Sequence, residues 1–180
     1  WIHIPICIHY VAWFYSVSYI FNYNIMDFPI LSSLILLPTI GALFIILTKS
    51  THSKNFQSSK YVALFVSFAN FFIAIYLWYI FDPSIAEFQF VEKRIWLEGF
   101  INYQVGIDGI SILFIVLSTL ITPLCIVSVN KTINIKLKEF LVAILIMESL
   151  MIGVFCSLDL VIFYLFFEGG LIPMFLIIGI

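Results

Sequence analysis

The sequence has 180 residues, of which 63% are hydrophobic and only 10% are charged, and its formal net charge is −2. Soluble globular proteins are about 25% charged, so this chain has more apolar surface than one soluble core can bury. The composition excludes an ordinary soluble domain, and the nearly balanced charge does not indicate nucleic-acid binding.

Residues 1–26 contain no Lys, Arg, Asp or Glu and are crowded with Trp and Tyr, but Pro5 and scattered His and Asn residues interrupt them. Tryptophan and tyrosine prefer the membrane–water interface, so this segment is either a sixth span or an interfacial helix. It lacks a basic start and a small-residue cleavage site, so we do not expect a cleaved signal peptide. We treat it as an N-terminal apolar and aromatic extension.

Three windows without charged residues follow, over 28–48, 61–81 and 109–130. A helix needs about 20 apolar residues to cross a hydrocarbon core roughly 30 Å thick, so each window has the length of one span. Two further spans are expected over 140–158 and 160–180, each with one acid inside. The runs are continuous and do not alternate, which favours helices over barrel strands. The sequence therefore predicts one all-α polytopic membrane domain with five transmembrane helices.

The connections between these spans differ in charge. The loops 49–60 and 130–139 contain lysines, whereas the connection 82–108 contains more acids than bases. Short lysine-bearing loops mark the cytoplasmic or matrix side of a membrane. Both lysine loops are therefore predicted to face inward and the connection 82–108 to face outward, which agrees with the number of spans between them.

Two carboxylates lie inside the last two predicted spans. Glu148 follows Glu139 by nine residues and Glu168 follows Asp159 by nine, which places each acid roughly 13 to 14 Å into the membrane. An ionised acid at this depth costs about 2.5–3.5 kcal/mol, so such residues usually face a cavity or a partner. A carboxyl group there can bind and release a proton as a cationic neighbour withdraws and approaches.

Glu168 has the surroundings of a hydrated kink. Pro173 has no N–H for the carbonyl of Gly169, and Gly169 and Gly170 leave the backbone beside the acid open. Tyr164 precedes Glu168 by four residues and shares its helical face. The alternative is an acid that only holds a neighbouring helix by a hydrogen bond.

Glu148 has less support, because the neighbouring Ser149 and Gly153 equally serve close helix packing. We expect Asp108 and Asp159 to cap the helices that they precede.

Neither a metal nor another cofactor is expected in this chain. The three cysteines and three histidines form no C-x-x-C pair and no Cys/His ligand spacing, and no glycine-rich phosphate loop is present. We therefore expect no NADH, flavin or Fe–S cluster to bind here.

Three motifs carry a family resemblance, which covers about residues 26–180. They are Met26-Asp-Phe-Pro-Ile-Leu, Val105-Gly-Ile-Asp-Gly-Ile-Ser, and the long run from Ile152 that contains Phe167-Glu-Gly-Gly-Leu-Ile-Pro-Met. In them the sequence resembles the amino-terminal part of the chain 4 family, the antiporter-like proton-pumping subunits of complex I. The resemblance implies a partial antiporter-like helix bundle.

The resemblance also implies roles for the two acids. Glu168 matches the family's proton-path carboxylate, whose lysine partner lies on a later helix without counterpart in these residues. Glu148 matches a position where only some members have an acid. The remainder of the proton path is expected from a missing C-terminal part or from a second chain.

The expected function is therefore that of a proton-translocating membrane-arm subunit of respiratory NADH:ubiquinone oxidoreductase, without a redox site of its own. Its expected partners are the lipid bilayer and other membrane-arm subunits, including a chain with the remainder of the subunit. The alternatives are a subunit of a multi-chain sodium/proton antiporter and a scaffold subunit without proton transfer. Richness in Phe, Ile, Tyr and Asn predicts an organellar gene and the mitochondrial inner membrane, with a bacterial plasma membrane as the alternative.

Overall fold

The computed structural model describes residues 29–47, 54–97, 101–129 and 136–179, without the side chains of 54–57, 95–97 and 101–102. The predicted extension over residues 1–26 lies outside this part of the chain. The elements are α2 (Ile30–Leu47), α3 (Lys54–Ile80), β1 (Gln89–Leu97), β2 (Ile101–Ile107), α4 (Gly109–Ser128), α5 (Leu137–Cys156) and α6 (Leu160–Gly179). Within these described ranges, five helices are long and apolar enough to cross a membrane. The predicted fold class, an all-α polytopic membrane protein with five such helices, is confirmed.

Carboxylates begin two of these helices, as their positions before the apolar runs predict. Asp108 precedes α4, and its Oδ1 accepts a hydrogen bond of 2.7 Å from the N–H of Ser111. Asp159 precedes α6, and its Oδ1 accepts a bond of 2.8 Å from the N–H of Val161. Each acid satisfies a donor that the first helical turn leaves without a partner.

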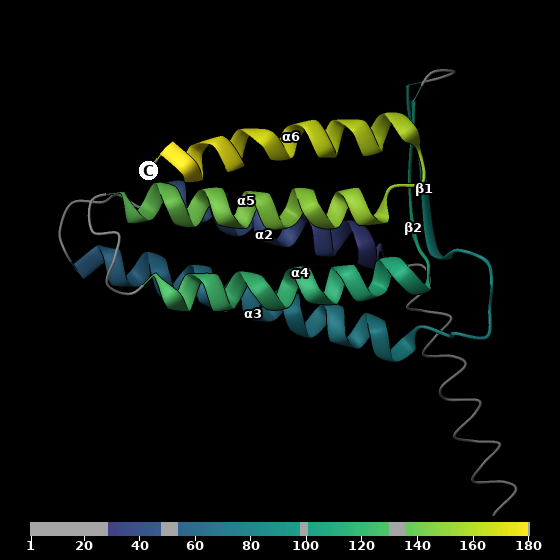
Figure 1. Cartoon of the computed structure of the whole chain (residues 1–180), viewed down its shortest axis with the longest axis horizontal. Coiled ribbons are helices and arrows are strands. Elements are labelled where there is room, and N and C mark those ends of the chain that lie inside the picture. The colour runs from purple at the N-terminus through teal and green to yellow at the C-terminus, as the bar shows by residue number, and fades with distance from the viewer. Residues whose placement is uncertain (1–28, 48–53, 98–100, 130–135, 180) are drawn as a thin grey trace, which may run out of the picture. The chain divides into compact units, whose positions relative to one another are not determined.

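Helix α5 is the packed centre of the bundle. Figure 1 shows it between α4 and α6, with α3 beside α4. A cluster of buried side chains also joins α5 to α2, α3 and α4: Ala42, Ile45, Ala63, Ile126, Leu141 and Leu145. Eight of the 20 residues of α5 are buried, against two of the 20 residues of α6. The two helices that carry the central acids thus have different environments.

The connection 82–108, which is predicted to face outward, contains an antiparallel hairpin that the sequence pattern did not reveal. Strand β1 pairs with β2, and the register shifts between Gln89 and Glu92. Phe90, inside this shift, has φ 54, the positive value that a bulged strand tolerates. Strand β2 also bonds to the turn between α5 and α6, where the N–H of Leu158 donates to the carbonyl of Gln104 at 3.0 Å. The hairpin therefore packs against one end of the helices.

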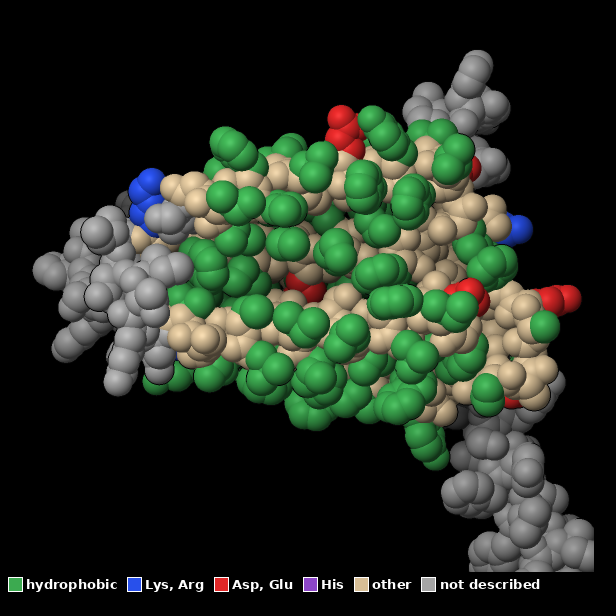
Figure 2. Space-filling model, in the orientation of Figure 1, with side chains coloured by type: hydrophobic (Ala, Val, Ile, Leu, Met, Phe, Trp, Pro, Cys, Tyr) green, Lys and Arg blue, Asp and Glu red, His purple; other side chains and the backbone are tan. Residues whose placement is uncertain are grey.

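The surface agrees with a membrane environment along the helices. Figure 2 shows hydrophobic side chains along the helices, whereas Lys and Arg side chains lie only at the two ends of the visible face. Acidic side chains are visible both at the hairpin end and partway along the helices. The acids partway along require a specific explanation, because lipid cannot solvate them.

Candidate functional site

Helix α6 has one face toward α5 and one face away from the described bundle. The inward stripe is Ile162, Phe166, Gly169 and Pro173, which follow each other at helical spacing and include the buried residues of this helix. The outward stripe is Leu160, Tyr164, Glu168, Leu171, Phe175 and Ile178, and all of these are exposed. Glu168 is therefore the polar member of an otherwise mostly apolar outer stripe.

Glu168 has one close polar neighbour among the described residues. The side chain of Tyr164, one turn earlier on the same stripe, interacts electrostatically with the carboxyl group of Glu168. Both side chains lie outside the bundle core. The expected approach of Tyr164 to Glu168 is present, and the carboxylate faces away from α5.

The two glycines beside Glu168 differ in their surroundings. A Cβ added to Gly169 would lie 3.4 Å from Leu150 of α5, whereas one added to Gly170 would have no atom within 4 Å. Pro173 is buried on the inward stripe. Gly169 and Pro173 thus belong to the contact with α5, and Gly170 leaves space beside the acid.

Glu148 has the opposite environment. Its side chain is only 3% exposed, and its Oε1 accepts a hydrogen bond of 2.9 Å from Nδ2 of Asn70 on α3. The neighbouring Ser149 donates its hydroxyl to the carbonyl of Ile35 on α2, at 2.5 Å. Adjacent side chains of α5 therefore bond to two different helices in the interior.

The structure does not bring the two acids together. Each lies eight residues from the hairpin-side end of its helix, about 12 Å along the helix axis. However, Glu148 points to α3, whereas α6 packs on another side of α5, at Leu150 and Gly153. The two acids therefore lie at a similar depth, but they belong to two separate sites.

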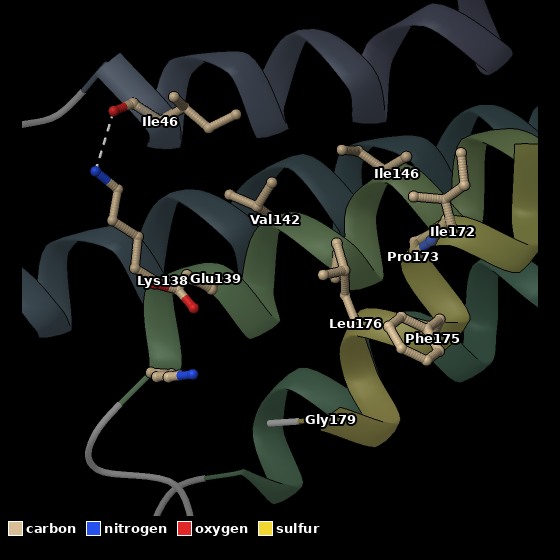
Figure 3. A pocket seen from close by; sticks show the side chains of 12 residues that line it. Ile46, Lys138, Glu139, Val142, Ile146, Ile172, Pro173, Phe175, Leu176 and Gly179 are labelled. Carbon is tan, nitrogen blue, oxygen red and sulfur yellow. Dashed lines mark hydrogen bonds between the residues drawn. The ribbon is translucent and has the colours of Figure 1, made fainter.

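A groove of about 670 Å³ lies at the lysine end, between α5 and α6 (Figure 3). Its walls are mostly apolar, with Val142, Ile172 and Leu176 among them, and they also include the charged residues Lys136, Lys138 and Glu139. Lys138 crosses from α5 to α2, where its Nζ donates to the carbonyl of Ile46 at 3.0 Å. Neither Glu148 nor Glu168 lines this groove, so it is separate from both acids.

Two polar residues with defined partners were missed in the sequence. Asn70 is fully buried in the middle of α3, and a lone amide within an uncharged window was the available signal. Glu92 is one of the acids of the connection 82–108, and its Oε1 accepts the N–H of Leu31 at 2.8 Å at the start of α2. Within the described ranges, no group of three or more His, Cys, Asp or Glu residues could hold a metal ion.

Curated proteins provide the family comparison, although no protein-family model matches the sequence. The chain is 44% identical over 156 residues to NADH-quinone oxidoreductase subunit M of Rickettsia prowazekii, which covers 86% of this chain and 32% of that protein. It is 43% identical over 151 residues to NADH-ubiquinone oxidoreductase chain 4 of Marchantia polymorpha, covering 83% and 30%. It is 51% identical over 124 residues to subunit M of Rhodobacter capsulatus, covering 69% and 24%.

The chain thus spans about a third or less of the length of these relatives. The identity nevertheless extends over most of the chain itself, in bacterial and plant relatives alike. Over that length, the chain is a homologue of part of the NADH-quinone oxidoreductase subunit M and NADH-ubiquinone oxidoreductase chain 4 proteins.

Proposed function

We propose that this chain forms part of the proton-translocating membrane arm of a respiratory NADH:quinone oxidoreductase, complex I, with Glu168 as a proton-transfer carboxylate. The observation that carries the proposal is a carboxylate midway along a membrane-spanning helix, on the helix face that the described bundle leaves uncovered. The names of the relatives support the choice of complex. Glu148 is the second carboxylate of the same layer.

A partner of opposite charge is the physical requirement of this site. An acid on a lipid-facing stripe costs about 2.5–3.5 kcal/mol when ionised, so the outward face of α6 needs a cover with a cation. We assign this role to a lysine from the remainder of the subunit or from another chain. When the lysine is close, Glu168 is ionised, and when it withdraws, Glu168 binds a proton. The hydroxyl of Tyr164 orients the carboxylate.

The proposal extends to partners and location. The chain assembles with other membrane-arm subunits, among them one that supplies the remainder of the antiporter-like subunit. It binds no NADH, flavin or Fe–S cluster, and the redox chemistry belongs to other subunits of the enzyme. The relatives come from bacteria and from plants, and we assign the chain to the mitochondrial inner membrane, with a bacterial plasma membrane as the alternative.

Two other functions make different predictions. A subunit of a multi-chain sodium/proton antiporter also uses Glu168 for ion movement, but it does not co-purify with NADH dehydrogenase activity. A scaffold subunit co-purifies with that activity, but proton transfer does not depend on Glu168. Purification of the assembled complex from its native membrane, followed by an NADH oxidation assay, distinguishes a complex I subunit from an antiporter subunit, because only the complex I subunit co-purifies with this activity.

Substitution Glu168→Gln tests the proton-transfer role directly. The amide keeps the shape of the side chain but cannot ionise, so we expect normal assembly and a several-fold loss of protons moved per NADH oxidised. The measurement is proton uptake by proteoliposomes that contain the complex. Glu168→Asp should restore part of the pumping, and Glu139→Gln, at an exposed acid of α5, should leave it unchanged. Full pumping by Glu168→Gln contradicts the proposal and favours the scaffold.

A further inference from the structure

The interface between α3 and α5 contains a buried polar pair whose hydrogen bonds are incomplete. Asn70 is 0% exposed and Glu148 is 3% exposed. The amide Nδ2 donates to Glu148 Oε1 at 2.9 Å, but Oε2 of Glu148 and Oδ1 of Asn70 have no hydrogen-bond partner among the described residues. Buried polar atoms nearly always have a partner, so these two oxygens require an explanation.

Neighbouring hydroxyl groups do not supply the missing donors. The hydroxyl of Ser67, one turn before Asn70, donates to the carbonyl of Leu64 at 3.2 Å. The hydroxyl of Ser149 donates to the carbonyl of Ile35. Both orphaned oxygens are acceptors if Glu148 is ionised, because a carboxylate and an amide oxygen have no hydrogen to donate.

Described cations are also distant from Glu148. Lys60 on α3 lies ten residues before Asn70, and Lys138 on α5 lies ten residues before Glu148, about 15 Å along each helix. The described part of α2 has no titratable side chain, and α4 has Cys125 as its single one. Among the side chains that the structure describes, the other titratable residues within the helices packed around Glu148 are Tyr61, Tyr76, Tyr79, Glu139, Cys156, Tyr164 and Glu168. None of these groups hydrogen-bonds to the Glu148 carboxyl.

A single proton resolves both orphaned oxygens. A carboxylic acid has one donor and one acceptor side by side, and so does an amide, so the two groups can form two hydrogen bonds with each other. One of these bonds is present, from Nδ2 to Oε1. A proton on Oε2 turns this atom into a donor. The acceptor for it is Oδ1, which belongs to the amide group that already bonds to the same carboxyl group.

We propose that Glu148 is a proton-binding site that is occupied in the resting protein, where its protonated carboxyl forms an acid–amide pair with Asn70. The O–H of Oε2 donates to Oδ1 of Asn70, and the amide Nδ2 donates to Oε1. The ligand is one proton, and no other group is needed to neutralise the carboxyl. The proposal concerns the protonation of Glu148 alone and does not depend on the role of Glu168.

Glu148 differs from Glu168 in what its chemistry requires from outside the chain. Its side chain is enclosed by the described helices, so its partner is already present, whereas the exposed Glu168 faces away from them. Glu148 therefore acts as a proton store within the bundle, at the same depth as the outward-facing acid.

Infrared spectroscopy of the intact complex tests this assignment. A protonated carboxyl group has a carbonyl-stretch band well separated from the bands of carboxylates, and ¹³C-labelled glutamate shifts that band. We expect the band in the wild-type complex at neutral pH, its loss from the Glu148→Gln complex, and its persistence in the Glu168→Gln complex. The Glu139→Gln variant, which changes an exposed acid of the same helix, should keep it as well.

Asn70 provides the second arm of the test. In Asn70→Ala the acid loses its amide partner, so the carbonyl band of Glu148 should move to higher wavenumber. A wild-type complex that shows only carboxylate bands for Glu148 overturns the proposal, and an unmoved band in Asn70→Ala overturns the pairing. If Glu148→Gln does not assemble, the carbonyl band of the ¹³C-labelled wild-type complex and the position of this band in Asn70→Ala still show whether Glu148 is protonated and paired with Asn70. Failure of Glu168→Gln to change pumping leaves these outcomes untouched.

Discussion

At the scale of single residues, burial separates two acids that the sequence makes alike. Glu148 and Glu168 lie at similar depth, each in an apolar span, but one is enclosed and bonded to Asn70 and the other is exposed on the outer stripe of α6. An enclosed acid with a neutral amide partner is stable in its neutral form, whereas an exposed one requires a cover. The same residue type therefore has two different environments at a similar depth of the bundle.

Glu92 shows how a loop residue stabilises a helix that is distant in sequence. Its carboxylate accepts hydrogen bonds from the N–H of Leu31 at 2.8 Å and from the N–H of Ser32 at 3.2 Å, and it accepts the Ser32 hydroxyl. The hydroxyl of Tyr103 lies 3.0 Å from that of Ser32. Burial raises the pKa of Tyr103 above its ordinary value, so this hydroxyl stays protonated and can donate.

Glu92→Ala removes this cap. We expect a loss of about 1–3 kcal/mol in the free energy of unfolding, because two N–H groups and one hydroxyl lose their acceptor. Reversible denaturation of the purified protein in detergent measures it. Glu87→Ala, at an exposed acid of the same connection, is the control and should change stability little. Equal effects of the two substitutions contradict the capping role.

Asp108 predicts a pH dependence of stability. The hydrogen bonds from Ser111 hold the pKa of its carboxyl below the ordinary value of 3.8. Because the folded pKa is lower than the unfolded pKa, this stabilisation is present above pH 3.8 and is lost as the pH falls through the folded value. Asp108→Ala should cost about 1 kcal/mol at neutral pH, and the difference from wild type should narrow in acid. A difference that widens in acid contradicts this assignment.

At the scale of elements, α5 and α6 are held together by a close approach at Gly153. A Cβ at this position would lie 2.7 Å from the ring of Phe166, so the ring or the helix would have to move. Overpacked positions of this kind cost about 1–3 kcal/mol. The two helices therefore depend on the absence of a side chain at one position.

Two alanine substitutions make a matched comparison of this contact. Gly153→Ala should lower the thermal midpoint of the purified protein by separating α5 from α6. Gly170→Ala, on the same pair of helices, has no atom within 4 Å of the added Cβ and should be neutral or slightly stabilising, since alanine favours helix. If Gly153→Ala is as stable as Gly170→Ala, the contact at Phe166 is not restrictive.

The helices were predictable from the sequence, because a continuous apolar run of one span length can satisfy its backbone hydrogen bonds in a bilayer in few ways other than as a helix. The hairpin was not predictable from the sequence. The charged run from Glu92 to Arg94 interrupts the alternation of polar and apolar residues that marks a strand, and the hairpin contacts the ends of helices that are distant in sequence. For the site, the depth of Glu148 and Glu168 follows from residue counting. Their faces do not, because continuously apolar helices give no pattern that tells an inner from an outer side.

At the scale of the whole molecule, the signs of the charged side chains at the helix ends match the directions of the helix dipoles. Helices α2, α4 and α6 begin on the hairpin side, where Glu92, Asp108 and Asp159 accept their first N–H groups. Lys138 bonds to a carbonyl near the opposite end of α2. Acids at helix N-termini and bases at C-termini complement the helix dipole. The charge asymmetry of the connections thus has a structural reason in addition to its effect on insertion.

Thiol labelling tests the orientation that this asymmetry predicts. In sealed right-side-out vesicles, a cysteine at Glu87→Cys should react with a membrane-impermeant reagent, whereas Lys136→Cys should react only after the vesicles are opened. Both positions are exposed, so access to the side chain does not separate them. The reverse pattern would show that the lysine side faces outward.

The hydrogen bond between Glu92 and Leu31 joins residues 61 positions apart, and this has a consequence for biosynthesis. A ribosome completes α2 long before it adds Glu92, and the chain must cross the bilayer again through α3 in between. The first amides of α2 therefore remain without this acceptor while α3 inserts. The first described helix is therefore completed by a segment translated later, and its N-terminal hydrogen bonds form only after the hairpin has been synthesised.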